Sequence, residues 1–382
     1  MTESLRQSSS EVIVDSDDFA RRVIEPVDFV ADAAAFIDVR LERSAGKASY
    51  SFIGPGVSQN PDQAVNLDVP HGFNIGAAGM ASGVVNSQHL HFTAEVFICT
   101  KGDWRVAVGE HREQQLELGA GTIFSAPTWV FRGFENIGDH DGWMYTVLGG
   151  DDTGGIIWAP DVIRAAAETG LYLRSDYTVV DGADGLSTND VVKPLEPAQL
   201  VSIDRYSDQE LAGRAVRQED LKWSEQALLS NVVTGHAGAM APVIGHGMTE
   251  DRRHRSPITS AHGFSVEWLR LPPGSSTGLH RHQQNQVVIL TDGTWDIAVN
   301  RDENRLHSRP AQGSVVSLNA GAWRDLTNVG DSDAHAVVVC ATDQRAVIEW
   351  DPGIVEAAQQ AGWSRDAGGY IAPVELIGRP VL

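Results

Sequence analysis

A short stretch after Gly83 contains three residues of types that bind metals. His89 and His91 are separated by one residue, and Glu95 lies four positions after His91. In an extended strand, alternate residues point to the same face, so these side chains share one face if the strand or its hairpin continues. Burying three polar groups without partners would be costly, and a divalent cation would satisfy all of them.

Two imidazoles and one carboxylate on one face of a metal form the facial triad that is typical of non-haem Fe(II), and they leave positions free for a substrate and O2. We therefore expect His89, His91 and Glu95 to bind Fe(II), although Mn, Ni, Co, Zn or Cu is also compatible with this set. The alternative is a pair of strand histidines beside an ordinary salt bridge. The motif alone is weak evidence, and its recurrence in the chain strengthens it.

The motif occurs a second time, in an internal repeat. When His89 is aligned with His280, "HGFNI" falls on "HGFSV" and "GDWRVAVG" falls on "GTWDIAVN". After one inserted residue the match continues, so that residues 48–170 correspond to residues 239–362. The repeat indicates an internal duplication that produced two homologous domains.

The second copy of the site differs from the first in charge. Its residues are His280, His282 and Gln286, with Arg324 at the position that corresponds to Arg132. A neutral amide in place of a carboxylate should lower the affinity for a cation, although an amide oxygen still allows weak binding. We therefore expect an altered site in the second domain, which is either a vestige or a weak metal site.

Both copies consist of short strand-like segments that end in a helix. Segments such as "DWRVAVGE" alternate apolar and polar residues, and glycine and proline interrupt them at short intervals, which is typical of a sandwich or barrel. A proline before and a glycine after an apolar, alanine-containing stretch predict helices over 161–169 and 353–361. We expect four parts in the chain: an N-terminal arm at 1–47, a metal-binding domain at 48–175, a linker with helical character at 176–238, and a domain with the altered site at 239–382.

The residues around both sites resemble those of the cupin family. The first cupin motif is matched at every position, by Gly83, His89, His91, Glu95 and Gly102. Most of the second motif is present in "GTIFSAPTWVFRGFEN", at Gly121, Pro127 and Asn136. The resemblance is to bicupins and covers most of the chain. It implies an all-β fold with two tandem double-stranded β-helix (jelly-roll) barrels and short helices.

Arg132 stands where the cupin family has its last histidine ligand. Within the bicupins, "LHRHQQNQVV" and "APTWVFRGFEN" resemble the gentisate 1,2-dioxygenase-type ring-cleaving enzymes, which take their third ligand from this position. An arginine stays protonated and cannot bind a metal. It can clamp an anionic group of the substrate, or it can pair with Glu95 in place of a metal. We expect Arg132 to be catalytic and to orient the substrate, in a pocket lined by Trp129, Phe131 and Phe97.

The net charge of −22 argues against two classes of partner. Nucleic acids and anionic membranes both attract basic surfaces, and the sequence shows none. No apolar run approaches the length that crosses a membrane, and the first residues are polar rather than typical of a signal peptide. The two cysteines, Cys99 and Cys340, lie in apolar strand-like runs, so we expect buried, reduced thiols and a cytoplasmic protein.

Together these observations predict a mononuclear Fe(II)-dependent dioxygenase that uses O2 to cleave a carbon–carbon bond. The expected substrate is a small anionic molecule, an aromatic or dicarbonyl acid. One alternative is a non-oxidative lyase or isomerase, in which the same metal stabilises an enolate. Another is a non-catalytic bicupin that binds a small molecule and has Glu95 paired with Arg132. The sequence leaves the oligomeric state open, a homo-oligomer included.

Overall fold

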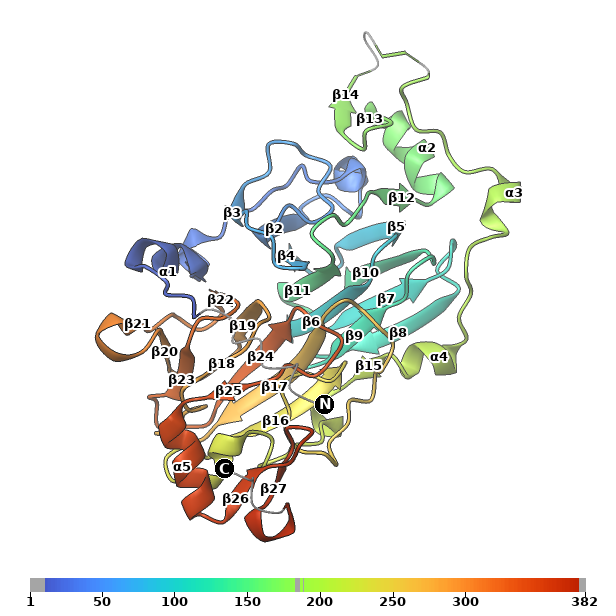
Figure 1. The fold of residues 1–382 in the computed structure, drawn as a ribbon. Helices are drawn as coiled ribbons and strands as arrows, with labels where there is room; N and C mark the ends of the chain where they lie inside the picture. The colour runs from blue at the N-terminus through green and yellow to red at the C-terminus, as the bar shows by residue number, and fades with distance from the viewer. Residues whose placement is uncertain (1–10, 183–185, 188, 378–382) are drawn as a thin grey trace, which may run out of the picture. The chain divides into compact units, whose positions relative to one another are not determined.

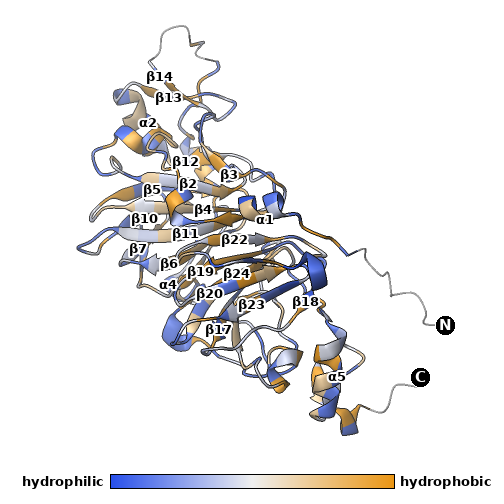
Figure 2. Ribbon diagram, turned by 90° about the vertical axis from the view of Figure 1, so that its left-hand side faces the viewer, coloured by the Kyte–Doolittle hydropathy of each residue, from blue (hydrophilic) through white to orange (hydrophobic). Residues whose placement is uncertain are grey.

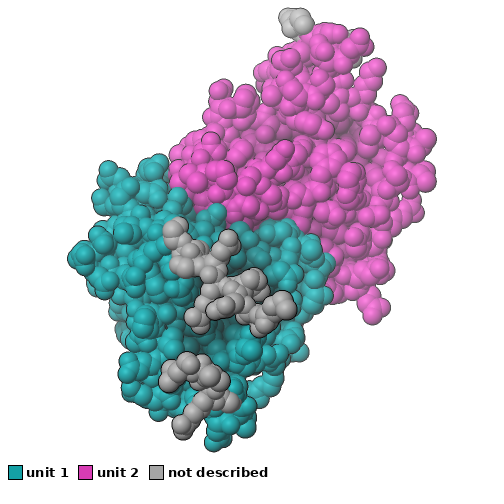
Figure 3. Space-filling view, in the orientation of Figure 1, with its two compact units in different colours: residues 1–28, 222–382 teal, residues 29–221 magenta. Residues whose placement is uncertain are grey.

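The computed structural model describes residues 11–182, 186–187 and 189–377, so residues 1–10 of the expected N-terminal arm lie outside the described part. Strands make up most of the regular structure (Figure 1). Internal contacts divide the chain into two units, residues 29–221 and residues 1–28 together with 222–382 (Figure 3). The limits predicted from the sequence remain our proposal for the domain boundaries.

The unit of residues 29–221 contains the first barrel, which is built from two sheets. One is a seven-stranded sheet in the spatial order β15 (Ala215–Val216), β9 (Ile123–Ala126), β6 (Glu95–Lys101), β11 (Gly142–Gly149), β4 (Phe73–Met80), β2 (Ala48–Ile53) and β3 (Val65–Leu67). The other is a five-stranded sheet in the order β12 (Ile156–Trp158), β5 (Val85–His91), β10 (Arg132–Asn136), β7 (Trp104–Val108) and β8 (Gln114–Leu118). Strands that are neighbours in these sheets are often far apart in the sequence, as in a jelly roll.

Aromatic side chains fill the first barrel below the polar site. Phe97 on β6, Trp104 on β7 and Phe134 on β10 are buried in one apolar cluster, and the rings of Trp104 and Phe134 meet edge to face with centroids 5.9 Å apart. The turn between β6 and β7 needs glycine at position 102. Its φ of 88° is left-handed, and a Cβ atom there would lie 2.9 Å from the Cα atom of Gly142.

The two helices predicted at the ends of the repeats are present. They are α2 (Pro160–Glu168) and α5 (Pro352–Gln360), and in both the proline occupies the first turn, where its missing N–H is not needed. Val162, Ile163 and Ala166 form the buried face of α2. The other helices are shorter: α1 (Ser16–Arg22), α3 (Pro197–Leu200) and α4 (Asp208–Ala212), with a 3-10 turn, η2 (Ile37–Arg40), near the start of the first unit.

The unit that contains residues 222–382 holds the second barrel. Its six-stranded sheet has the order β1 (Val23–Ile24), β22 (Val315–Leu318), β19 (Gln286–Leu290), β24 (Ala334–Cys340), β17 (Ser265–Leu271) and β16 (Ala239–Ile244). Its five-stranded sheet has the order β21 (Leu306–Ser308), β20 (Trp295–Val299), β23 (Arg324–Asn328), β18 (His280–Arg281) and β25 (Glu349–Trp350). The edge strand β1 comes from the N-terminal segment, and β19, β22 and β24 are rich in valine. Figure 2 colours the strands of both barrels by hydropathy.

Each unit also has a two-stranded sheet outside its barrel. In the first unit β13 (Leu171–Leu173) pairs with β14 (Val179–Asp181), and in the second β26 (Trp363–Arg365) pairs with β27 (Ile371–Pro373). Cys99 and Cys340 are free and buried, which confirms the expectation of reduced thiols. Among the described residues, no helix has both the length and the apolar character that crossing a membrane requires.

Candidate metal centre in the first barrel

The short connection from β5 to β6, two strands that belong to the two different sheets of the barrel, brings the three expected metal ligands together. His89 and His91 lie near the end of β5, where strand alternation points both imidazoles to one side, and Glu95 is the first residue of β6. All three side chains are buried. Their ligand atoms lie within 4.8 Å of one another, and no other described group of three or more His, Cys, Asp or Glu residues is arranged in this way.

One of the two histidines, His89, is held by the backbone in a form suited to metal binding. The Nδ1 atom of His89 lies 2.7 Å from the carbonyl oxygen of Ser87, so Nδ1–H donates there and the Nε2 lone pair remains free. The Nε2 atom of His91 lies 3.6 Å from Oε1 of Glu95. Burial lowers the pKa of both imidazoles, and the charge of Arg132 lowers it further, so both rings are neutral at physiological pH.

Arg132 pairs with Glu95 in the barrel wall. Its Nη2 and Nε atoms donate to Oε2 of Glu95 at 2.7 and 3.1 Å, and the arginine side chain is fully buried. Burial alone would raise the pKa of the Glu95 carboxyl, but the adjacent guanidinium outweighs it and holds that pKa well below its usual range. Of the two roles that the sequence left open for Arg132, the structure shows the pairing with Glu95.

This pairing uses only one of the two carboxylate oxygens. Oε2 of Glu95 accepts from Arg132, whereas Oε1 faces His91. Two neutral imidazole nitrogens and one anionic oxygen therefore converge, and this donor set suits Fe, Mn or another divalent first-row metal. The positive charge of the nearby guanidinium weakens the binding of a metal cation. The residues still fit a metal, because Oε1 of Glu95 and both imidazoles are available as ligands.

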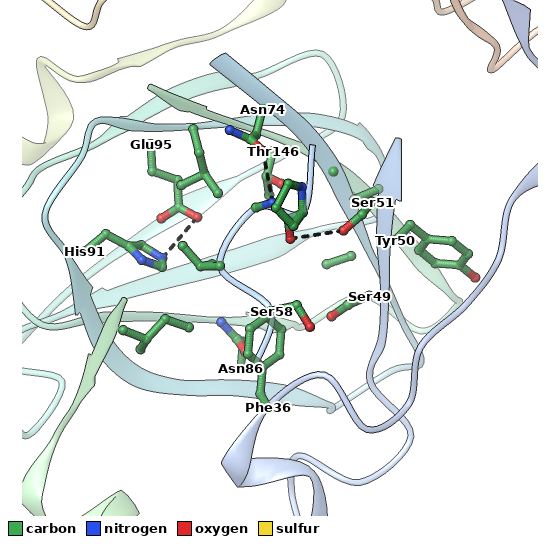
Figure 4. Close-up of a pocket in the computed structure, with 18 of the residues that line it drawn as sticks. Phe36, Ser49, Tyr50, Ser51, Ser58, Asn74, Asn86, His91, Glu95 and Thr146 are labelled. Atoms are coloured by element: carbon green, nitrogen blue, oxygen red, sulfur yellow. Dashed lines mark hydrogen bonds and ion pairs between the residues drawn. The ribbon is translucent and has the colours of Figure 1, made fainter. Parts of the chain in front are cut away.

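A cavity of about 70 Å³ opens onto His89, His91 and Glu95. Its wall is largely polar on the side that β2 supplies, where Ser49 and Ser51 lie opposite His91 and Glu95 (Figure 4). A water molecule needs about 10–15 Å³ of such volume, so the cavity accommodates a few water-sized groups. Its size suits a small acid better than a large ring.

The aromatic residues expected to line the pocket lie elsewhere in the described structure. Phe97 belongs to the core of the first barrel, and Phe131 packs in the apolar cluster that includes α2. Trp129 is 49% exposed and contacts Phe92 at the surface, with ring centroids 5.2 Å apart. Neither these three residues nor Arg132 is among the residues that line the cavity.

One charged residue of the cavity wall, Lys47, was not singled out from the sequence. It precedes β2 and is 3% exposed. A single lysine at the start of an ordinary strand gives no periodic or spacing signal. Its burial depends on Asp38 and Asn86, which are distant from it in the chain.

The corresponding site of the second barrel is filled by an arginine. Nη1 of Arg324 lies 3.2 Å from Oε1 of Gln286 and 3.3 Å from Nε2 of His282, and Nη2 donates to the carbonyl oxygen of Asn319 at 2.6 Å. Burial lowers the pKa of Arg324 to about 10, so the guanidinium is still charged at neutral pH. The guanidinium therefore contacts Nε2 of His282 and Oε1 of Gln286, two atoms that a metal would need as ligands. His280 lies next to it.

A buried acid in the second barrel was also missed by the sequence analysis. Glu267 on β17 is fully buried, accepts a hydrogen bond from the backbone N–H of Met248 at 2.7 Å, and leaves Oε2 without a partner. Burial raises the pKa of its carboxyl to about 8. The repeat alignment places it opposite Gly76, and that glycine-to-acid difference inside a strand was the available signal.

Glu267 should make the stability of the second barrel depend on pH. Because folding raises its pKa from about 4.5 to about 8, the contribution of Glu267 to stability is complete below pH 4.5 and falls as pH rises to 8, by up to about 1.4 kcal/mol per pH unit. Glu267→Gln should remove this slope and be the more stable protein at pH 8, as measured by urea unfolding at pH 5, 7 and 9. The exposed substitution Glu303→Gln is the control. Parallel stability curves for Glu267→Gln and the unsubstituted protein would contradict the assignment.

Similarity to known proteins agrees with this architecture. The family model of the cupin domain matches residues 267–340. The beta-alanine degradation protein BauB of Pseudomonas aeruginosa is 33% identical over 87 residues, which are 22% of this chain and 85% of that protein.

Solved structures share the two-barrel fold at low sequence identity. The oxalate decarboxylase of Lactobacillus farciminis, in complex with formate, has a TM-score of 0.53 at 13% identity, over 90% of both chains. The 7S globulin of Momordica charantia has a TM-score of 0.51 at 9% identity, over 86% of both chains. These likenesses concern the fold. With the family match and the two jelly-roll barrels, they show that the chain belongs to the cupin superfamily and is a bicupin.

Proposed function

We propose that the first barrel is a mononuclear metal-dependent enzyme that breaks a carbon–carbon bond of a small carboxylic acid. The observation that carries this proposal is the convergence of His89, His91 and Glu95 on a small cavity. The second barrel then has no metal of its own, because Arg324 occupies its centre.

Each residue of the first site has a separate task in this proposal. The bound metal would supply Lewis-acid character or, as iron, a centre that reacts with O2. His89 keeps its Nε2 atom directed at the site because its Nδ1–H is tied to the backbone. Arg132 acts as a positioning residue, since it fixes one oxygen of Glu95 and keeps the carboxylate anionic. The hydroxyl group of Ser49 lines the cavity and is available to bind an oxygen of a substrate, whereas that of Ser51 accepts a hydrogen bond from Gln63.

The first candidate reaction is O2-dependent cleavage by an Fe(II) dioxygenase. Three protein ligands leave more open positions than four, which suits a substrate that binds through two oxygens together with O2. The second candidate is a non-oxidative lyase, in which the metal stabilises an enolate. The small size of the cavity and the fold shared with oxalate decarboxylases favour this second reaction. A cytoplasmic location and a homo-oligomeric state remain predictions.

The test is to measure metal content, O2 uptake and CO2 release on the same preparation, purified without chelator. We expect about one metal ion per chain, as the two unequal sites imply, and turnover of small acids that a chelator abolishes. O2 uptake in proportion to turnover supports the dioxygenase, and CO2 release without O2 uptake supports the lyase. A protein that takes up no metal under any loading condition would be the non-catalytic binder instead.

A further inference from the structure

Lys47 places a buried positive charge in the wall of the first-barrel cavity. Its ammonium nitrogen donates to Oδ1 of Asp38 at 2.6 Å and to Oδ1 of Asn86 at 2.5 Å. An ammonium group has three N–H donors, and the described structure gives partners to two of them. The third is therefore available to an acceptor that enters the cavity.

The partners of Lys47 connect it to the strand that carries the histidines. Asn86 lies on β5, three residues before His89, and borders the cavity (Figure 4). Asp38 accepts a second hydrogen bond, at Oδ2, from the backbone N–H of Ser87 at 3.0 Å. Both partners are thus fixed relative to the candidate metal ligands, and the direction of the ammonium group is fixed with them.

Aromatic rings bound the other side of the ammonium group. The Nζ atom lies 4.8 Å from the ring centre of Phe36 and 6.0 Å from that of Trp158. The ring of Trp158 in turn lies 5.2 Å from the ring of His89. One indole therefore neighbours both the lysine and a candidate metal ligand, and all three residues line the same cavity.

Stability alone does not account for this lysine. Full burial of a lysine is rare, and a buried ion pair contributes little net stability because both charges lose their hydration. Burial lowers the pKa of Lys47, and only Asp38 opposes that effect, through its charge and its hydrogen bond. An apolar side chain of similar volume would fill the same space at lower cost.

The second copy of the repeat supports a functional role. There Gly238 corresponds to Lys47, and Thr277 corresponds to Asn86. A Cβ atom at Gly238 would lie 2.7 Å from the side chain of Leu271, so the lysine has no counterpart in that space. The copy that lacks the lysine is also the copy with Gln286 in place of the carboxylate ligand. The buried lysine and the carboxylate ligand thus occur together in the first barrel, and both are absent from the second.

We propose that Lys47 binds the carboxylate of the substrate in the first-barrel cavity, and that it thereby makes this site selective for small carboxylic acids over their neutral analogues. The inference rests on the proposed function and specifies its substrate-binding residue. It assigns the charge recognition to Lys47 rather than to Arg132, whose Nε and Nη2 donate to Glu95 and which does not line the cavity.

The experiment compares binding of formate, oxalate, malonate and neutral malonamide to the Mn-loaded protein by calorimetry, with metal content measured on each sample. The test variant is Lys47→Met combined with Asp38→Asn, because the double substitution leaves no unpaired buried carboxylate. We expect the dissociation constants of the bound acids to rise by about tenfold or more, as for loss of a charged hydrogen bond, with malonamide unaffected. Lys193→Met, at an exposed lysine, is the matched control and should leave binding unchanged.

The outcomes separate this inference from the proposed function. A double variant that folds, keeps its metal and binds the acids as tightly as the unsubstituted protein would overturn the role of Lys47. Absence of binding by all three acids in the unsubstituted protein would overturn it as well. If no metal binds, but the metal-free protein binds the acids and loses that binding in the double variant, the enzyme proposal fails and the role of Lys47 stands.

Discussion

Replacing Glu95 by glutamine is expected to abolish metal binding in the first barrel and, with it, activity. The substitution removes the single anionic ligand and gives the first site the composition of the second, which has His280, His282 and Gln286. Loss even of residues that only support a metal ligand weakens binding by about 10–100-fold, so loss of the charged ligand itself should cost at least about a hundredfold. The measurement is metal content by mass spectrometry, with turnover of the best acid substrate.

The second barrel supplies both a precedent and a control for this substitution. Arg324 accepts glutamine as a neighbour, with Nη1 3.2 Å from Oε1 of Gln286, so Glu95→Gln has a folded counterpart within the same chain. Gln286→Ala should leave metal content and turnover unchanged. Full metal content in Glu95→Gln, or metal loss only in Gln286→Ala, would place the metal elsewhere and refute the ligand set proposed for the first barrel.

Arg132→Met is expected to make the stability of the protein depend on metal. The substitution leaves the Glu95 carboxylate buried without its ion-pair partner, which should lower the unfolding free energy of the metal-free protein by about 3–5 kcal/mol. A metal bound to that carboxylate would neutralise it. At a thousandfold excess over the dissociation constant, binding restores about 4 kcal/mol, so Mn(II) should recover most of the loss.

The measurement is thermal and urea unfolding of Arg132→Met with a chelator and with saturating Mn(II). Arg324→Met is the matched control, because Arg324 is equally buried but faces an amide. That variant should lose stability, and Mn(II) should stabilise it no more than it stabilises the unsubstituted protein. Removal of the guanidinium should also tighten Mn(II) binding, since a repelling charge is gone. If Mn(II) stabilises neither variant, the pair of Glu95 and Arg132 replaces the metal and the first barrel is a non-catalytic binder.

Much of the fold follows from the sequence alone, because it depends on local and repeated features. The alignment of His89 with His280 holds over most of two domains, and duplication of that extent requires two copies of one fold. The ends of α2 and α5 follow from proline and glycine, whose backbone preferences act locally. The grouping of His89, His91 and Glu95 was also predictable, since strand alternation and the short connection to the next strand suffice to bring these side chains together.

The tertiary structure decided what surrounds those three residues, because each neighbour comes from a distant part of the chain. Arg132 could have pointed at a substrate or at Glu95, and the register of β10 against β5, which pairs Arg132 with His89, places it beside the carboxylate. Trp129 and Phe131 are close to Arg132 in the sequence, yet the turn before β10 directs them away from the cavity. Lys47 carries no sequence signal, since its burial depends on Asp38 and Asn86. Residue types and their spacing thus determined the metal-binding set, whereas long-range packing determined the charges around it and hence what the cavity can bind.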